Sequence, residues 1–141
     1  MIVLDTNVIS EVMRERPDTG VLAWIDDQPA GELCVTAITE AEIRTGIAIL
    51  PDGSRKLGLV DAVERAFGTL FAGRVLPFDS NAAQAYAQIA ADRRARGRPI
   101  SQADCQIAAT ARSIRASLAT RNVSDFDGCG IDVINPWNAD A

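Results

Sequence analysis

The hydrophobic positions of this chain form short apolar runs separated by longer amphipathic segments. The runs are too short for helices and predict five buried strands, at residues 2–5, 32–37, 74–78, 117–121 and 131–135. Helical periodicity and end signals between them predict six helices, one beginning at residue 6 and the others over about 20–27, 39–50, 55–71, 81–96 and 102–115. Strands that alternate with helices are typical of an α/β fold, with a mostly parallel sheet covered on both faces.

Length and composition favour one domain. The 141 residues are 48% hydrophobic and 23% charged, which is globular composition, and they contain no linker or repeat. We therefore expect a single domain over residues 1–141. The N-terminal segment has no basic lead and no small-residue cleavage site, and no apolar run is long enough to span a membrane, so we expect no signal peptide, no membrane contact and a cytoplasmic location.

The residue types restrict the chemistry. The sequence has no histidine, which excludes a Ser-His-Asp triad, a Cys-His dyad, a histidine base and any histidine-containing zinc site. Cys34, Cys105 and Cys129 are odd in number and form no CxxC pair, which argues against a disulfide framework or structural zinc and for a reducing compartment. Carboxylates, hydroxyls, arginines or a metal ion must carry any reaction.

Charge is distributed unevenly along the chain. The net charge is −5, yet the segment from Arg93 to Arg121 holds seven arginines and one acid, a local balance of +6. Arginine binds phosphate through a planar fork of donors, so this segment suits a polyanion partner. A solvated, arginine-rich helix end is the alternative interpretation.

Acidic and amide residues gather where predicted strands end and helices begin. Asp5 ends the first strand, and Asn122 and Asp125 follow the fourth. We place Glu42 and Asp104 in the first turns of their helices. In parallel sheets, ligands bind beyond the carboxyl ends of the strands, where the strand order reverses, so these residues are candidates for one site.

Each acid also has a structural interpretation. Thr39-x-x-Glu42 has the spacing of a capping box, Ser101-x-x-Asp104 resembles one, and Asp5 can cap the helix that follows it. However, Asp104 shares an apolar helical stripe with the residues three, four and seven places further on, so its carboxylate is predicted to face inward. An inward carboxylate is costly unless it is paired or bound to a cation.

A metal ion would reconcile these acids. If Asp5, Glu42 and Asp104 converge, their repulsion raises at least one pKa unless a divalent ion lies among them. Oxygen ligands completed by water suit Mg²⁺ or Mn²⁺, and such an ion can activate water and stabilise charge on a phosphate without a histidine. Beside an arginine-rich flank, this arrangement suits phosphodiester hydrolysis.

Four ordered segments, LDTNVISE, TAITEAEIRTGIAILP, ADCQIAATA and ATRNVSDF…VINPW, resemble the PIN-domain family, and within it the FitB-like group of bacterial VapC-type toxins. The resemblance covers nearly the whole chain. It implies an α/β/α sandwich and a ribonuclease that depends on Mg²⁺, with Mn²⁺ as a substitute. It also implies the toxin role in a type II toxin–antitoxin module. The expected partners are RNA, a cognate antitoxin through which DNA is bound, and a second copy of the chain, within a larger complex.

The resemblance also implies residue roles. Asp5 matches the first metal-binding aspartate, Asp104 the second and Glu42 the motif glutamate, while Thr6 matches the hydroxyl thought to help hold the metal or water. Where some relatives have aspartate after ATR, this chain has Asn122, with Asp125 three residues later. Which of the two completes the acidic site stays open. Asparagine keeps an oxygen donor without the charge, which would weaken a second metal position.

Surface residues give further expectations. Arginines at the end of the helix 81–96 are candidate contacts to the RNA backbone, namely Arg93, Arg94, Arg96 and Arg98. Glu40 is expected to be exposed. Trp24, Phe67 and Phe71 belong either to the core or to an antitoxin or dimer surface.

Two other function classes compete with the nuclease. A phosphoacceptor or phosphatase with Asp5 as nucleophile needs a lysine at a later strand end, or an aspartate in place of Asn7, whereas the chain's one lysine, Lys56, lies in or before a helix. A catalytically weak or inactive PIN-fold module that regulates transcription with its antitoxin is the stronger alternative, because Asn122 departs from an all-acidic site. Metal-dependent RNA cleavage would distinguish it from the nuclease.

Overall fold

The computed structural model describes residues 1–29 and 31–138. Its strands form one five-stranded sheet in the order β3-β2-β1-β4-β5, and every pairing is parallel. The strands are β1(Ile2–Leu4), β2(Leu33–Thr36), β3(Val75–Leu76), β4(Ser117–Ala119) and β5(Val133–Ile134). The predicted α/β class and five strands are confirmed, and the sheet is parallel throughout.

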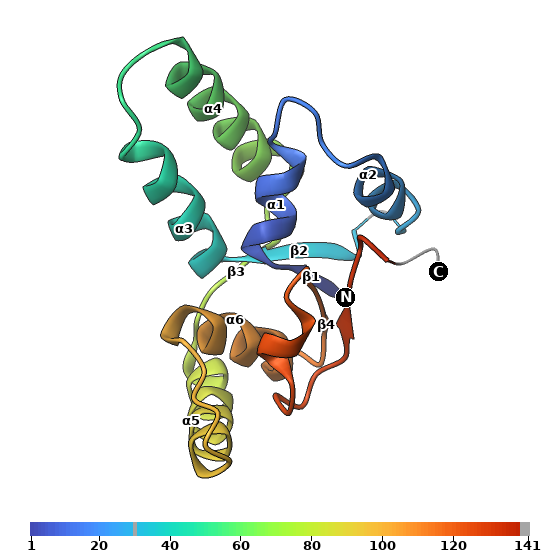
Figure 1. Cartoon of the computed structure of the whole chain (residues 1–141), viewed down its shortest axis with the longest axis vertical. Helices are drawn as coiled ribbons and strands as arrows, with labels where there is room; N and C mark the ends of the chain where they lie inside the picture. Colours follow the sequence, from blue (N-terminus) through green and yellow to red (C-terminus); the bar gives the residue numbers. More distant parts are fainter. Residues whose placement is uncertain (30, 139–141) are drawn as a thin grey trace.

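Six α-helices connect the strands (Figure 1). They are α1(Thr6–Val12), α2(Thr19–Asp26), α3(Ala37–Ala48), α4(Ser54–Arg65), α5(Ser80–Ala95) and α6(Gln102–Ser113). Two short turns were not predicted as separate elements: the π-helical turn η1(Ala66–Leu70), which extends α4, and the 3-10 turn η2(Val123–Phe126), which follows β4. None of the helices in the described ranges is both long and apolar enough to cross a membrane.

The sheet separates two hydrophobic cores, which gives the α/β/α layering. Successive side chains of a strand point to opposite faces, so Val3 packs with α5 and α6 while Leu4 packs with α1, α3 and α4. Cys34 and Val35 divide in the same way. Figure 1 shows α5 and α6 on one side of the sheet and α1, α3 and α4 on the other. Even two- to four-residue strands can therefore supply both cores.

The residues expected in either the core or a partner surface pack into the core. Phe67 is buried, and Trp24 and Phe71 are partly buried against the same cluster. All three cysteines are buried with free thiols, as expected. The expectation for Glu40 was wrong, because its carboxylate is partly buried and accepts a hydrogen bond from Nε of Arg44 at 2.7 Å.

The order in which the chain adds strands to the sheet reverses at β1. From β1 it winds outward through β2 and β3, and it then returns to the other side of β1 as β4 and continues to β5. The crevice between the carboxyl ends of β1 and β4 is consequently the switch point at which ligands bind in sheets of this kind.

Candidate active site

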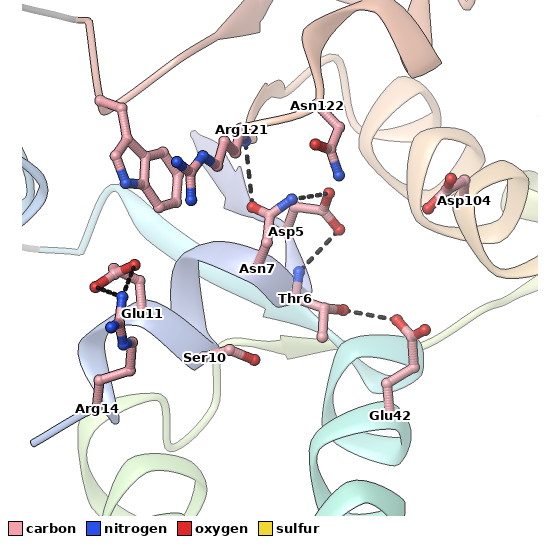
Figure 2. Close-up of a pocket in the computed structure, with 11 residues that line it drawn as sticks. Asp5, Thr6, Asn7, Ser10, Glu11, Arg14, Glu42, Asp104, Arg121 and Asn122 are labelled. Atoms are coloured by element: carbon pink, nitrogen blue, oxygen red, sulfur yellow. Dashed lines mark hydrogen bonds and ion pairs between the residues drawn. The ribbon is translucent and has the colours of Figure 1, made fainter. Parts of the chain in front are cut away.

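A cleft of about 470 Å³ opens at this switch point, above the ends of β1 and β4 (Figure 2). Its lining includes Asp5, Thr6, Glu42, Asp104 and Asn122 of the predicted set. Figure 2 shows these five side chains gathered around one part of the cleft. The predicted convergence of residues from four separate segments is therefore observed. Residues that the sequence did not single out as site residues complete the lining: Asn7, Ser10, Glu11, Arg14, Arg121 and Trp137.

Asp5 is buried at the floor of the cleft, with only 5% of its surface exposed, the same fraction as Glu11 of the same lining. It is the N-cap of α1, and its Oδ1 accepts a hydrogen bond from the backbone N–H of Thr6 at 2.8 Å. Oδ2 accepts hydrogen bonds from Oγ1 of Thr120 at 2.8 Å and from Nδ2 of Asn7 at 3.4 Å. The capping interpretation of Asp5 is thus correct, and the same cap holds the carboxylate at the cleft.

The two aspartates carry raised pKa values. Burial is the main cause for Asp5, and the charges of Asp104 and Glu42 add to it, while hydrogen bonds from Thr120 and Thr6 oppose it. Burial also raises the pKa of Asp104, with Ser101 opposing and the charges of Asp125 and Glu42 adding. The charges of neighbouring acids thus add to the cost that burial places on ionising Asp5 and Asp104.

A chain of threonine hydroxyls leads to Glu42. Oγ1 of Thr6 donates to Oε1 of Glu42 at 2.6 Å. The one hydroxyl proton of Thr6 is used in this hydrogen bond, so Oγ1 of Thr39, 3.1 Å away, donates to Oγ1 of Thr6. Oγ1 of Thr36 donates in turn to Oγ1 of Thr39 at 3.4 Å. Thr36 and Thr39 are fully buried, so two interior hydroxyls fix the orientation of Thr6 beneath an exposed glutamate.

The capping box predicted from Thr39 and Glu42 was wrong. The helix begins two residues earlier than expected, and Thr36 is the N-cap, with its Oγ1 accepting from the backbone N–H of Thr39 at 3.1 Å. Glu42 accordingly lies beyond the first turn and has no capping role. Because Thr36 is the cap, the hydroxyl of Thr39 is available to donate a hydrogen bond to Thr6.

Asp104 approaches the cleft from the opposite side of the sheet. Its helix, α6, is capped by Ser101, whose Oγ accepts from the backbone N–H of Asp104 at 3.2 Å. The predicted cap and first-turn position are therefore correct. The side chain is half-buried, and Figure 2 shows it across the cleft from Asp5, with Asn122 above the two.

The donor set fits a hard divalent cation. Asp5, Glu42 and Asp104 take part in none of the ion pairs formed among residues 1–29 and 31–138. A buried carboxylate without a cation is costly, and oxygen ligands with water are what Mg²⁺ and Mn²⁺ prefer. Within the same described ranges, no three His, Cys, Asp or Glu side chains lie close enough to hold a metal ion by themselves. A metal here would thus need water for most of its coordination.

Comparison with known proteins finds the family that the sequence resembles. Residues 2–127 match the profile of the PIN domain. The chain is 47% identical to VapC ribonuclease Y4jK of Sinorhizobium fredii, over 97% of this chain and 98% of that protein. It is 44% identical to toxin FitB of Neisseria gonorrhoeae, over 98% and 99%. A solved structure of FitAB bound to an IR36 DNA fragment superposes with a TM-score of 0.91 at 43% identity, covering 98% of this chain and 96% of that one.

The chain belongs to the PIN-domain family. The α/β/α sandwich predicted from the resemblance is the fold observed for this PIN domain.

The structure separates the two candidates for the last polar position of this PIN domain. Asn122 lines the cleft, whereas Asp125 does not. Asp125 is exposed on η2, and its backbone N–H donates to the carbonyl of Asn122 at 3.1 Å. Its charge still contributes to the raised pKa of Asp104. Asn122 therefore lies in the cleft, whereas Asp125 influences Asp104 through its charge from outside the cleft.

Arg93 does not fit the predicted role as an RNA contact. Only 5% of its surface is exposed, and its guanidinium donates to the carbonyls of Arg98, Asp125 and Asp127 at 2.7, 2.8 and 3.2 Å. It joins the end of α5 to the turn that carries Asp125. An arginine used in this way has the same local sequence as an exposed one, so the sequence held no signal of its burial.

The other three predicted arginines lie outside the cleft. Arg94, in the last turn of α5, and Arg96 and Arg98, which follow that helix, are all exposed. Arg96 and Arg98 lie 3.9 and 3.8 Å from Asp92 and Asp127. The cations that line the cleft of this PIN domain are instead Arg14 and Arg121.

Proposed function

We propose that this PIN domain is a metal-dependent endoribonuclease and the toxin of a type II toxin–antitoxin module. The observation that carries the proposal is the convergence of Asp5, Glu42 and Asp104 in one cleft, with no cationic partner among the described residues. The name of the relative Y4jK, a VapC ribonuclease, supports the reaction type, and the name of toxin FitB supports the biological role.

Asp5 and Asp104 would hold the metal, with Mg²⁺ as the natural ion and Mn²⁺ as a substitute. When bound, a divalent ion supplies Lewis-acid stabilisation of the negative charge that builds up on the phosphate oxygens. Asn122 offers an amide oxygen at the same edge of the cleft and adds no charge.

Glu42 is the proposed proton acceptor. Its Oε1 accepts the Thr6 hydroxyl, while Oε2 has no hydrogen bond to the described residues and can accept a proton from the attacking water. In the reaction, the water oxygen bonds to phosphorus and one ester P–O bond breaks. The water proton goes to Glu42, and the leaving oxygen takes a proton from solvent. The threonine chain keeps Oε1 engaged, which orients the carboxylate for this transfer.

The test is cleavage of a mixed pool of tRNA and stem-loop RNA by the antitoxin-free chain, with Mg²⁺, with Mn²⁺ and with chelator. We expect cleavage that requires metal and is lost in Asp5→Asn. The matched control is Asp61→Asn, which changes an exposed aspartate on α4 in the same way and should cleave normally. Cleavage in the presence of chelator, or cleavage by folded Asp5→Asn at the wild-type rate, would contradict the proposal.

We propose further that a cognate antitoxin inhibits the chain by placing a cationic segment in this cleft. Three acids without described cationic partners would attract an arginine, which can take the position of the metal. Exposed Leu57 and Val60 on α4 offer apolar area for the antitoxin or a second copy of the chain. DNA would be bound through the antitoxin, and the solved FitAB complex with a DNA fragment supports such an assembly.

A binding module without effective catalysis is the second candidate. Asn122 favours it, because an amide in the cleft supplies one negative charge less than an acid would. On this alternative, folded and metal-loaded chain cleaves no RNA in the pool, while the complex with its antitoxin still binds operator DNA. Asn122→Asp should then create or raise cleavage.

A further inference from the structure

The cleft is polarised along its length. Asp5, Glu42 and Asp104 occupy one end, whereas Arg121 and Arg14 lie toward the other (Figure 2), where Trp137 lies against Arg121. The proposed chemistry uses only the acidic end. The cationic and aromatic residues at the other end have no role in holding a metal or in moving a proton.

Arg121 is arranged as a flat, charged surface. Its guanidinium carbon lies over the ring of Trp137, 5.1 Å from the ring centroid. Stacking on an aromatic ring restricts the long side chain to one plane and leaves its in-plane N–H groups free to donate. The side chain is exposed and donates no hydrogen bond to residues 1–29 or 31–138, and it forms no ion pair with them.

The position of Arg121 is tied to the acidic end. Its backbone N–H donates to Oδ1 of Asn7 at 3.2 Å. The amide nitrogen of the same Asn7 donates to Oγ1 of Thr120 at 3.1 Å and reaches Oδ2 of Asp5 at 3.4 Å. One asparagine side chain thus sets the spacing between the buried aspartate and the stacked arginine.

Arg14 differs from Arg121, because it is already neutralised. Its Nη1 lies 3.2 Å from both carboxylate oxygens of buried Glu11. Arg121 is therefore the cleft cation whose charge no described carboxylate balances. Its unbalanced charge and exposed plane suit a ligand that is both flat and anionic.

We propose that Arg121, stacked on Trp137, forms a nucleotide subsite that takes the base and phosphate next to the scissile bond of single-stranded RNA. Bases stack on guanidinium planes and aromatic rings, and arginine N–H groups donate to phosphate oxygens. A cationic antitoxin segment would be repelled at this end, so the charge favours RNA. The inference rests on the proposed ribonuclease function and adds to it where the substrate strand lies.

The test compares a short single-stranded RNA with an abasic oligomer of equal length, both fluorescently labelled, in the presence of Mg²⁺. Binding is measured by anisotropy in an Asp104→Asn background, so that cleavage does not interfere. Arg121→Lys keeps the charge and removes the plane. We expect it to weaken binding of the base-bearing RNA by about tenfold, the loss of one base stack. Binding of the abasic oligomer should change little.

Two further variants keep the result interpretable. Trp137→Leu removes the ring beneath Arg121 and should reproduce the selective loss, provided that its melting temperature stays close to the parent's. Arg65→Lys, an exposed arginine on α4, should leave both affinities unchanged. Equal losses for the two oligomers, or no loss for either, would overturn the subsite. A chain that shows the selective loss yet never cleaves RNA in its wild-type form would support the subsite and contradict the ribonuclease.

Discussion

The two sides of the cleft hold their polar residues differently. On the first side, Asp5 and Thr6 are hydrogen-bonded to the completely buried hydroxyls of Thr120 and Thr39, and Thr6 in turn donates to exposed Glu42. The second side consists of half-buried Asp104 and exposed Asn122, and exposed Asp125 lies next to it on the 3-10 turn, outside the cleft.

The difference indicates which positions are set before substrate arrives. Buried hydroxyls hold a carboxylate in one orientation, because any other orientation leaves a buried polar group unsatisfied. Exposed side chains on a turn can change orientation without this cost, because water satisfies their hydrogen bonds. The first side is therefore the preorganised part of the site, and we expect the second side to adjust its side chains when a ligand binds.

The largest contrast is expected between aspartates on the two sides. Asp5→Asn should lower kcat/KM for RNA cleavage by at least about a hundredfold, since it removes preorganised charge from the reacting centre. Asp125→Asn should lower it far less, because this side chain acts only through its charge. Initial cleavage rates measure both. Similar losses in the two variants would mean that the sides are equivalent.

Removing the hydroxyl beneath Asp5 should weaken folding. Thr120→Val removes the hydrogen bonds that Thr120 makes with Oδ2 of Asp5 and with the amide of Asn7, and leaves these two groups only their 3.4 Å contact with each other. This change should lower the free energy of unfolding by about 1–3 kcal/mol. Urea denaturation measures the change. Ser124→Ala, an exposed hydroxyl on the second side, is the matched control and should stay close to wild type.

The threonine chain should show a smaller effect of the same kind. Thr39→Val breaks the chain to Glu42 and should cost about 0.5–1.5 kcal/mol of stability, together with a modest fall in kcat. Thr45→Val, on the exposed face of α3, separates this effect from the change in helix propensity. A Thr39→Val chain with unchanged kcat would show that Thr6 orients Glu42 without help.

The buried charge of Asp5 should also appear in the pH dependence of stability. Its pKa in the folded chain is raised above 3.8, so between these two values the folded state binds the proton more tightly than the unfolded state. In metal-free solution, the free energy of unfolding of the wild type should therefore fall as pH rises through this window. Asp5→Asn lacks this contribution, so its advantage over the wild type should grow with pH. A constant difference would contradict the raised pKa.

The smallest effects belong to the arginines outside the cleft. If Arg94, Arg96 or Arg98 contacts the RNA backbone, its alanine variant should reduce the slope of log affinity against log salt by about 1. Arg93→Ala should instead destabilise the fold, because its guanidinium holds three backbone carbonyls. Unchanged slopes in all three exposed variants would remove these arginines from the RNA path.

Much of the fold was predictable, because each strand is a short apolar run and most of the helices between the strands carry clear end signals. The convergence of Asp5, Glu42 and Asp104 followed from strand ends meeting at one edge. Sequence could not choose between Thr36 and Thr39 as the helix cap, since each has a backbone N–H three residues later and only tertiary packing decides.

Two other features could not be predicted from the sequence for a similar reason. Arg93 is buried because it meets carbonyls of a turn that lies 32 and 34 residues away in the chain, and no local pattern reports such a contact. Asn122 and Asp125 were indistinguishable because the intervening 3-10 turn, which points one into the cleft and the other away, has no strong sequence signature.

The central position of β1 has a consequence for synthesis of the chain. Asp5 is made first, yet the hydroxyl that holds it belongs to Thr120, 115 residues later. Until β4 leaves the ribosome, β1 has one bare edge, and the floor of the cleft is missing although all three acids have already been made. We therefore expect the cleft to form only after β4 has been translated, so that a nascent chain can carry all three acids without an assembled site.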